Sequence, residues 1–372
     1  MTIWKWTATG LLQMEGLDLN DSKPTIIKCG GGLNVDDPAA VIGNESAYVS
    51  EFFDFATTYI HVSKSEIRTL FCGPLEGKLV LGYFILRKLL GTISANPEDA
   101  NYAGRETGGF CDSVDIIDVS YTSINDNFDS MYGHYESADF VSSDARRFAE
   151  LLFAPLLDKY YPHNLPGLYE RLSLITLFGV SYGSCFIIEV ENALRGMLVR
   201  RRSSEAESAD ILARVFCIAI SNMSNVRGAA GPRFSGVYFE GANDRLAEWM
   251  NPHKVEVLSE NQWRLIPLGD HRCLIVGPVP VHPSRWIETI PDVDYEELNA
   301  DSMGHYIPFY TMRCLPHNPL PSLVETVFAG AVRSQVTQLE PGCVISPELG
   351  DILSRASLRG GHRGIAAALS HK

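Results

Sequence analysis

Short apolar runs alternate with amphipathic segments from residue 66 onward. A buried parallel strand is apolar on both faces and a surface helix on one, so this alternation predicts an α/β fold with a mostly parallel central sheet flanked by helices. The apolar runs predict strands at Ile67–Cys72, Val114–Tyr121, Leu172–Phe178, Val215–Ile220 and Phe234–Phe239, and a meander at Val255–Leu258, Trp263–Leu268 and Arg272–Val276. Helical spacing predicts helices over Lys78–Leu90 and Ser184–Leu198. A third helix is expected from a cap at Ser143 through Leu156, with Phe148, Leu151, Leu152 and Leu156 facing inward.

The pattern divides the chain into three parts. Residues 1–65 are expected to be an irregular N-terminal addition, with a turn at Gly30-Gly31-Gly32 and an edge hairpin over Ala47–Val62. Residues 66–345 would form the main domain, and residues 346–372 a C-terminal tail. Three polar segments, 91–112, 122–141 and 280–304, are long enough to supply a lid.

Composition narrows the function classes. The net charge of −14 over 372 residues argues against binding to nucleic acid or to an anionic membrane. The eight cysteines form no C-x-x-C pair or zinc spacing, and Cys185 and Cys217 lie in apolar runs, which indicates buried free thiols in a reducing compartment. No signal peptide and no integral membrane segment is evident, so we expect a cytoplasmic protein without cofactor or metal. A protein exported without a signal would have the same pattern.

The main chemical signal is Gly179-Val180-Ser181-Tyr182-Gly183, a G-x-S-x-G motif between an apolar strand and a helix. This order is typical of a nucleophile elbow, in which a tight turn between small residues exposes the serine hydroxyl above a helix N-terminus. The alternative is a glycine-rich turn with a serine helix cap. The motif therefore predicts that Ser181 is the nucleophile of a serine hydrolase or acyltransferase.

A second motif follows the next strands. The strand Phe234–Phe239 leads into Gly241-Ala242-Asn243-Asp244-Arg245-Leu246. A strand, a glycine and N-D-R-L before a helix resemble the acid turn of the α/β-hydrolase superfamily, and the resemblance covers roughly residues 66–310. It implies an α/β-hydrolase-like, esterase- or lipase-like domain in which Asp244 orients a later histidine. The alternative role of Asp244 is a helix N-cap.

Three histidines compete for the base. His305, in Asp301-Ser302-Met303-Gly304-His305, follows the expected strands and is favoured because similar arrangements occur in lipase-like members of the superfamily. His271 has a suitable spacing from Asp244, but a strand-like sequence follows it. His282 is the third candidate.

The oxyanion hole needs two N–H donors. Tyr182, directly after the nucleophile, is the expected first donor. The superfamily places the second after an earlier strand, here Ile67–Cys72, but Pro74 has no N–H, so we expect Leu75. The same loop, Gly73 to Lys78, differs from a phosphate-binding loop because it is one residue too short and Leu79 replaces the magnesium-binding Ser or Thr.

These residues together predict hydrolysis of an ester, thioester or amide of a small-molecule or lipid-like acyl substrate through an acyl-enzyme. An acyltransferase would use the same residues with an alcohol or amine in place of water. A non-catalytic binding or scaffold protein of the same fold is the third hypothesis, favoured by Pro74 and by the competing histidines.

Overall fold

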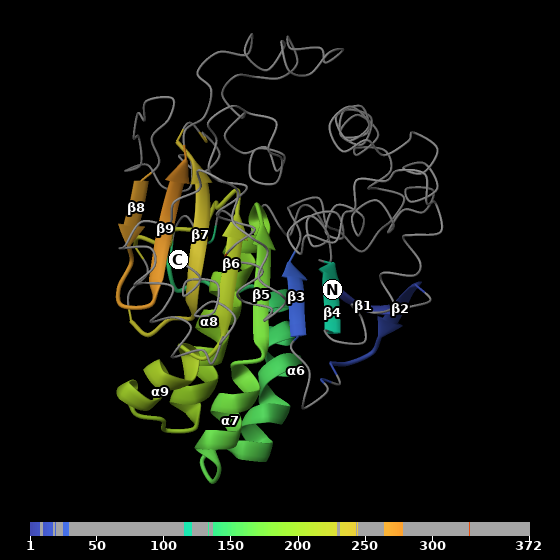
Figure 1. The fold of residues 1–372 in the computed structure, drawn as a ribbon. Coiled ribbons are helices and arrows are strands. Elements are labelled where there is room, and N and C mark those ends of the chain that lie inside the picture. Colours follow the sequence, from blue (N-terminus) through green and yellow to red (C-terminus); the bar gives the residue numbers. More distant parts are fainter. Residues whose placement is uncertain are drawn as a thin grey trace, which may run out of the picture.

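A nine-stranded sheet forms the centre of the fold (Figure 1). The structure, a computed structural model, describes residues 1–7, 10–17, 19, 25–29, 115–120, 133, 137–228, 231–242, 244, 264–277 and 327. Its strands are β1 (Thr2–Thr7), β2 (Gly10–Met14), β3 (Thr25–Cys29), β4 (Asp115–Ser120), β5 (Ile175–Val180), β6 (Phe216–Ile220), β7 (Ser235–Gly241), β8 (Arg264–Pro267) and β9 (Arg272–Gly277). Its helices are α6 (Ser143–Tyr160), α7 (Leu165–Leu172), α8 (Tyr182–Arg200) and α9 (Glu205–Leu212).

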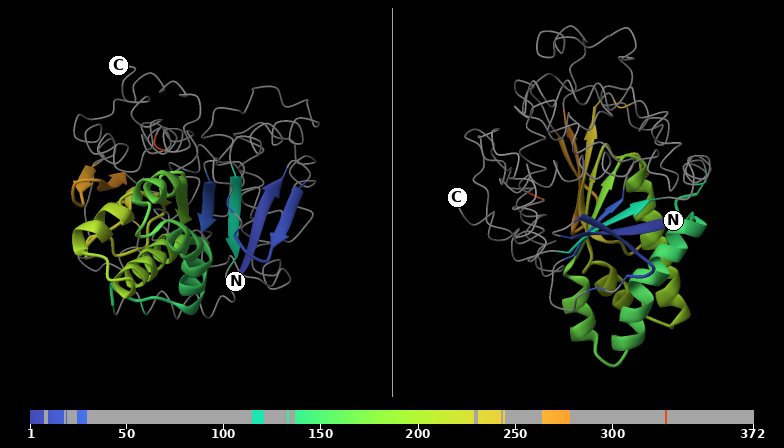
Figure 2. Two further views of the ribbon diagram at one scale, coloured as in Figure 1. Left: turned by 90° about the horizontal axis from the view of Figure 1, so that it is seen from below. Right: turned by 90° about the vertical axis from the view of Figure 1, so that its right-hand side faces the viewer.

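The sheet is mostly parallel, as predicted. The strand order is β2-β1-β4-β3-β5-β6-β7-β9-β8. Strands β4, β3, β5, β6, β7 and β9 run parallel to one another, whereas β1 and β8 are antiparallel to their neighbours. Figure 2 shows β1 and β2 at one end of this row and β8 at the other. The carboxyl ends of the parallel strands therefore share one edge, where ligands bind in open α/β sheets.

Three strands within the first 29 residues, β1, β2 and β3, are part of this sheet. β1 and β2 form an antiparallel hairpin at one end, and β3 lies near the centre between β4 and β5. The predicted boundaries near residues 65 and 345, the strand 67–72, the helix 78–90, the hairpin 47–62, the strand 255–258 and the tail lie outside the described residues.

Two predicted boundaries are wrong. The apolar run Leu172–Phe178 is divided between a helix and a strand, because Asn164 caps α7, which ends at Leu172, and β5 begins only at Ile175. Helix α6 is capped by Ser142 rather than Ser143, and the Ser142 Oγ accepts the N–H of Ala145 at 3.2 Å. Local periodicity does not separate the end of one element from the start of the next.

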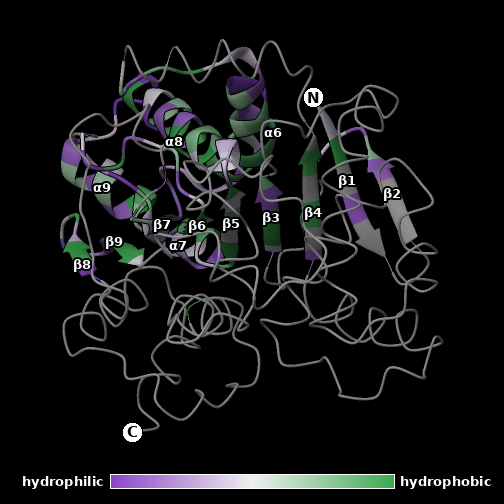
Figure 3. Ribbon diagram, turned by 90° about the horizontal axis from the view of Figure 1, so that it is seen from above, coloured by the Kyte–Doolittle hydropathy of each residue, from purple (hydrophilic) through white to green (hydrophobic). Residues whose placement is uncertain are grey.

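Helices α6 and α8 lie on the same side of the sheet (Figure 3). Every residue of α8 from Tyr182 to Leu194 is buried, because α8 packs between the sheet and α6. The rings of Phe148 in α6 and Phe186 in α8 have centroids 5.7 Å apart. Strands β5, β6, β7 and β9 are buried along their whole length, as is typical of parallel strands covered on both faces. Among the described residues, no helix is both long and apolar enough to cross a membrane.

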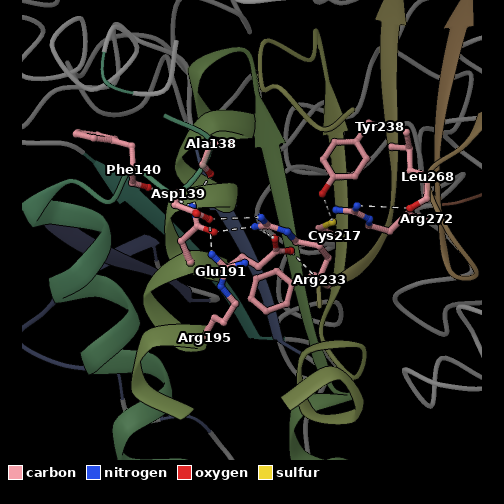
Figure 4. A network of polar contacts seen from close by, with 12 residues as sticks. Ala138, Asp139, Phe140, Glu191, Arg195, Cys217, Arg233, Tyr238, Leu268 and Arg272 are labelled. Atoms are coloured by element: carbon pink, nitrogen blue, oxygen red, sulfur yellow. Dashed lines mark hydrogen bonds and ion pairs between the residues drawn. The ribbon is translucent and has the colours of Figure 1, made fainter. Parts of the chain in front are cut away.

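A buried ion pair joins α8 to the start of β7 (Figure 4). The Arg233 Nη1 donates to the Glu191 Oε1 at 2.6 Å and to the Asn192 Oδ1 at 2.7 Å. The second oxygen of Glu191 accepts the backbone N–H of Phe234 at 2.7 Å. Because both charged groups are almost completely buried, removing either partner would leave an uncompensated charge in the core. The contact fixes the position of α8 relative to β7.

Helix α8 also contains a buried carboxyl group that titrates at an unusual pH. Burial raises the pKa of Glu189 to about 8, although its Oε2 accepts the N–H of Ser142 at 2.8 Å. In the unfolded chain the group ionises near its ordinary pKa of 4.5. Between these two values the unfolded state binds fewer protons than the folded state, so Glu189 lowers the stability of the fold as the pH rises from about 4.5 to about 8.

Glu189→Gln should remove this pH dependence. We compare the free energy of unfolding of the variant with that of wild type. The difference, variant minus wild type, should be larger at pH 9 than at pH 5 by on the order of 2–4 kcal/mol. Urea unfolding at the two pH values measures the difference. Glu150→Gln, at an exposed position of α6, is the matched control. A stability difference between Glu189→Gln and wild type that does not change with pH would contradict the prediction.

Candidate functional site

Ser181 occupies the only position between β5 and α8. Its backbone has φ 54° and ψ −121°, a combination that residues with a Cβ rarely adopt. Two hydrogen bonds hold this turn: the Ser181 N–H donates to the Ile220 carbonyl at 3.1 Å, and the Ser184 N–H donates to the Ser181 carbonyl at 2.9 Å. Ser221, after β6, also has a positive φ of 50°, but no helix follows it. Ser181 is thus held in a strained turn at the N-terminus of a buried helix.

Gly179, the first glycine of the motif, allows the strand and the helix to approach closely. A Cβ on Gly179 would lie 2.8 Å from the Ile187 Cδ1 and 2.9 Å from the Gly183 carbonyl oxygen. The carbonyl is the harder of the two to displace, because it belongs to the backbone of the first turn of α8. Any residue larger than glycine at position 179 would therefore push α8 away from β5.

The segment after β6 is hydrogen-bonded to the same turn. The Ser184 hydroxyl donates to the Ser181 carbonyl at 2.7 Å and accepts the N–H groups of Met223 and Ser224 at 2.9 and 3.2 Å. The Ser181 hydroxyl donates to the Met223 sulfur, with the oxygen and the sulfur 3.4 Å apart. The buried Ser184 hydroxyl therefore holds the Ser181 turn in place against the residues that follow β6.

Two buried carboxyl groups lie at the end of β7. Asp244 has 2% of its surface exposed, and its N–H donates to the Gly241 carbonyl at 3.2 Å. Glu240, the sixth residue of β7, is equally buried and accepts a hydrogen bond from the Asn222 Nδ2 at 3.3 Å. The sequence reasoning missed Glu240 and Asn222. The available signal was a carboxylate and an amide at the carboxyl ends of two neighbouring apolar strands.

His271 lies at the opposite edge of the sheet from Ser181. It directly precedes β9, and its Nε2 is 3.2 Å from the carbonyl oxygen of Arg233, which precedes β7. Ser181 follows the carboxyl end of β5, which is parallel to these strands. A strand of six residues spans about 20 Å. His271 is therefore too far away to accept a proton from Ser181. His282 and His305 lie outside the described residues.

The first expected oxyanion donor lies at the start of α8. Tyr182 is the first residue of this helix and is buried, so its N–H belongs to the positive end of the helix dipole. Leu75 lies outside the described residues. Strand β5 lies between β6 and β3. The last residue of β3, Cys29, is aligned with Gly179.

The described cysteines do not compete with Ser181 as nucleophiles. All four, Cys29, Cys185, Cys217 and Cys273, are buried free thiols, as predicted for Cys185 and Cys217. Burial raises the pKa of Cys217 to about 12 and raises the pKa values of Cys185 and Cys273 as well. A thiol attacks only as the thiolate, so Cys185, Cys217 and Cys273 are inert at neutral pH. In the described part of the chain, no group of His, Cys, Asp and Glu side chains could hold a metal ion.

Comparison of the sequence with models of protein families finds no match, and comparison with curated proteins finds no significant match.

Proposed function

We propose that this protein is a serine hydrolase that cleaves an ester, thioester or amide through an acyl-enzyme on Ser181. The observation that carries the proposal is the backbone of Ser181, with φ 54° at a strand-to-helix turn. Such a conformation costs on the order of 1–3 kcal/mol for a residue with a Cβ, and glycine would adopt it without strain. A serine in this position is therefore better explained by the hydroxyl that it places at the helix N-terminus than by the conformation of the turn.

The proposed reaction uses Ser181, a histidine and the N–H group of Tyr182. The Ser181 hydroxyl attacks the carbonyl carbon and transfers its proton to a histidine, and the N–H of Tyr182 stabilises the oxyanion that forms. The histidine then protonates the leaving group, and water releases the acyl group by the same steps in reverse. Asp244, buried beyond β7, supports this scheme as the group that orients the histidine.

The second oxyanion donor is proposed in the segment that follows β3. Cys29 is aligned with Gly179, and Gly30-Gly31-Gly32 come directly after it. Each of these glycines has a backbone N–H and no side chain that would block a substrate. This segment offers three N–H donors, whereas Pro74 offers none in the segment that contains Leu75.

Ser181→Ala should abolish hydrolysis of p-nitrophenyl butyrate, with a loss of at least about 10³-fold in kcat/KM. A fluorophosphonate probe should add one adduct to the wild-type protein and none to the variant, as measured by intact-protein mass. Ser221→Ala, at a second serine with positive φ among the described residues, is the control and should retain the adduct. Wild-type protein that forms no adduct on Ser181 would favour the non-catalytic scaffold hypothesis.

His305 remains the proposed base, and His271→Ala should retain activity because His271 lies at the other edge of the sheet. His305→Ala should lose about as much activity as Ser181→Ala. The kcat/KM of the wild-type protein should rise with pH through one ionisation near neutrality, since only the neutral imidazole accepts the proton. If His282→Ala is inactive and His305→Ala is active, His282 is the base.

A pair of isosteric variants tests whether Asp244 or Glu240 is the acid that orients the histidine. Asp244→Asn should lower kcat by about 10³- to 10⁴-fold, because the amide favours the wrong histidine tautomer. Glu240→Gln should lose less than about tenfold, since the amide oxygen still accepts the Asn222 hydrogen bond. Circular dichroism and thermal unfolding check that both variants fold. The reverse order of activities would assign the acid role to Glu240.

A further inference from the structure

We infer that Met223 forms a wall of the acyl-binding site and selects the acyl group of the substrate. The inference rests on the proposed function of Ser181 and extends it to the substrate. The observation is the 3.4 Å distance between the Met223 sulfur and the Ser181 hydroxyl oxygen, the atom that would carry the acyl group.

The Ser181 hydroxyl donates its hydrogen toward the Met223 sulfur, and the acyl carbon takes the place of this hydrogen in the acyl-enzyme. In the acyl-enzyme the carbonyl carbon is one covalent bond from the Ser181 oxygen, and its substituents lie within one further bond. The acyl carbon replaces the hydroxyl hydrogen that Ser181 directs at the sulfur, so an acyl group in that direction lies within contact distance of the Met223 side chain. The leaving group departs before deacylation, whereas the acyl group stays beside Met223 through both half-reactions.

The backbone of Met223 is fixed, so the side chain alone can adapt. Its N–H donates to the Ser184 hydroxyl at 2.9 Å, and the preceding residue, Asn222, donates its N–H to the Phe239 carbonyl at 3.0 Å. Met223 is 96% buried, with 4% of its surface exposed. Methionine has an unbranched and polarizable side chain that presents an apolar surface. The wall therefore suits an uncharged, aliphatic acyl group and limits its size close to the carbonyl carbon.

The test varies the acyl group while the leaving group stays constant. The kcat/KM values for p-nitrophenyl acetate, butyrate and octanoate are measured with the wild-type protein, Met223→Ala and Met223→Phe. Met223→Ala should raise the octanoate-to-acetate ratio by about tenfold or more, because a hydrophobic pocket discriminates methylene groups by roughly 10- to 200-fold. Met223→Phe should lower the same ratio.

Met197→Ala is the matched control. Met197 is a buried methionine of α8, 16 residues from Ser181, which corresponds to about 24 Å along the helix axis. Truncation there should lower thermal stability without changing the octanoate-to-acetate ratio. A second series compares p-nitrophenyl butyrate with ethyl butyrate, and Met223→Ala should leave this leaving-group ratio unchanged.

Two outcomes would overturn the inference while the proposed function stands. In one, wild-type protein forms the fluorophosphonate adduct on Ser181, but Met223→Ala does not change the octanoate-to-acetate ratio of kcat/KM values. The other is a change in the leaving-group ratio alone, which would place Met223 beside the leaving group. Wild-type protein that forms neither a fluorophosphonate adduct nor an acyl-enzyme on Ser181, by intact-protein mass, would overturn the proposed function and this inference together.

Discussion

The close approach of β5 and α8 at Gly179 is the constraint on which the candidate site depends. A Cβ at this position would collide with the Gly183 carbonyl oxygen and with Ile187. Without a side chain there, the chain turns from strand to helix within one residue, and Ser181 takes up the strained backbone of that turn. The helix that follows is buried from Tyr182 to Leu194, so its packing energy is available to offset the local strain.

The parallel sheet brings the other candidate residues to the same edge. Strands β5, β6 and β7 are neighbours, and Ser181, Met223 and Asp244 follow their carboxyl ends in this order. The Ser184 hydroxyl joins the first two positions through three hydrogen bonds. Because the Ser184 hydroxyl contacts backbone groups of Ser181 and Met223, the relative positions of these two residues are nearly independent of their own side chains.

Buried polar groups on α8 determine how this helix sits against the rest of the protein. The pair of Glu191 and Arg233 holds α8 to the start of β7, and Glu189 accepts the N–H of Ser142 at the N-terminus of α6. The buried guanidinium of Arg233 lies beside Glu191, with the Arg233 Nη1 and the Glu191 Oε1 2.6 Å apart. Glu189 has its pKa raised by burial, so it makes the scaffold under Ser181 sensitive to pH.

The sequence alone determined the features that depend on local patterns. Apolar runs predicted strands at the positions of β4, β6, β7 and β9, and the G-x-S-x-G motif predicted the turn at Ser181, because strand burial and glycine sterics are encoded within a few residues. The meander expected to include β9 is wrong for its pairing with β7, because these two strands are parallel. Only the tertiary structure placed β3 beside β5, put His271 at the far edge and brought Met223 to Ser181. Those relations join residues 38 or more positions apart, and they follow from strand order and hydrogen-bond register, which no local pattern records.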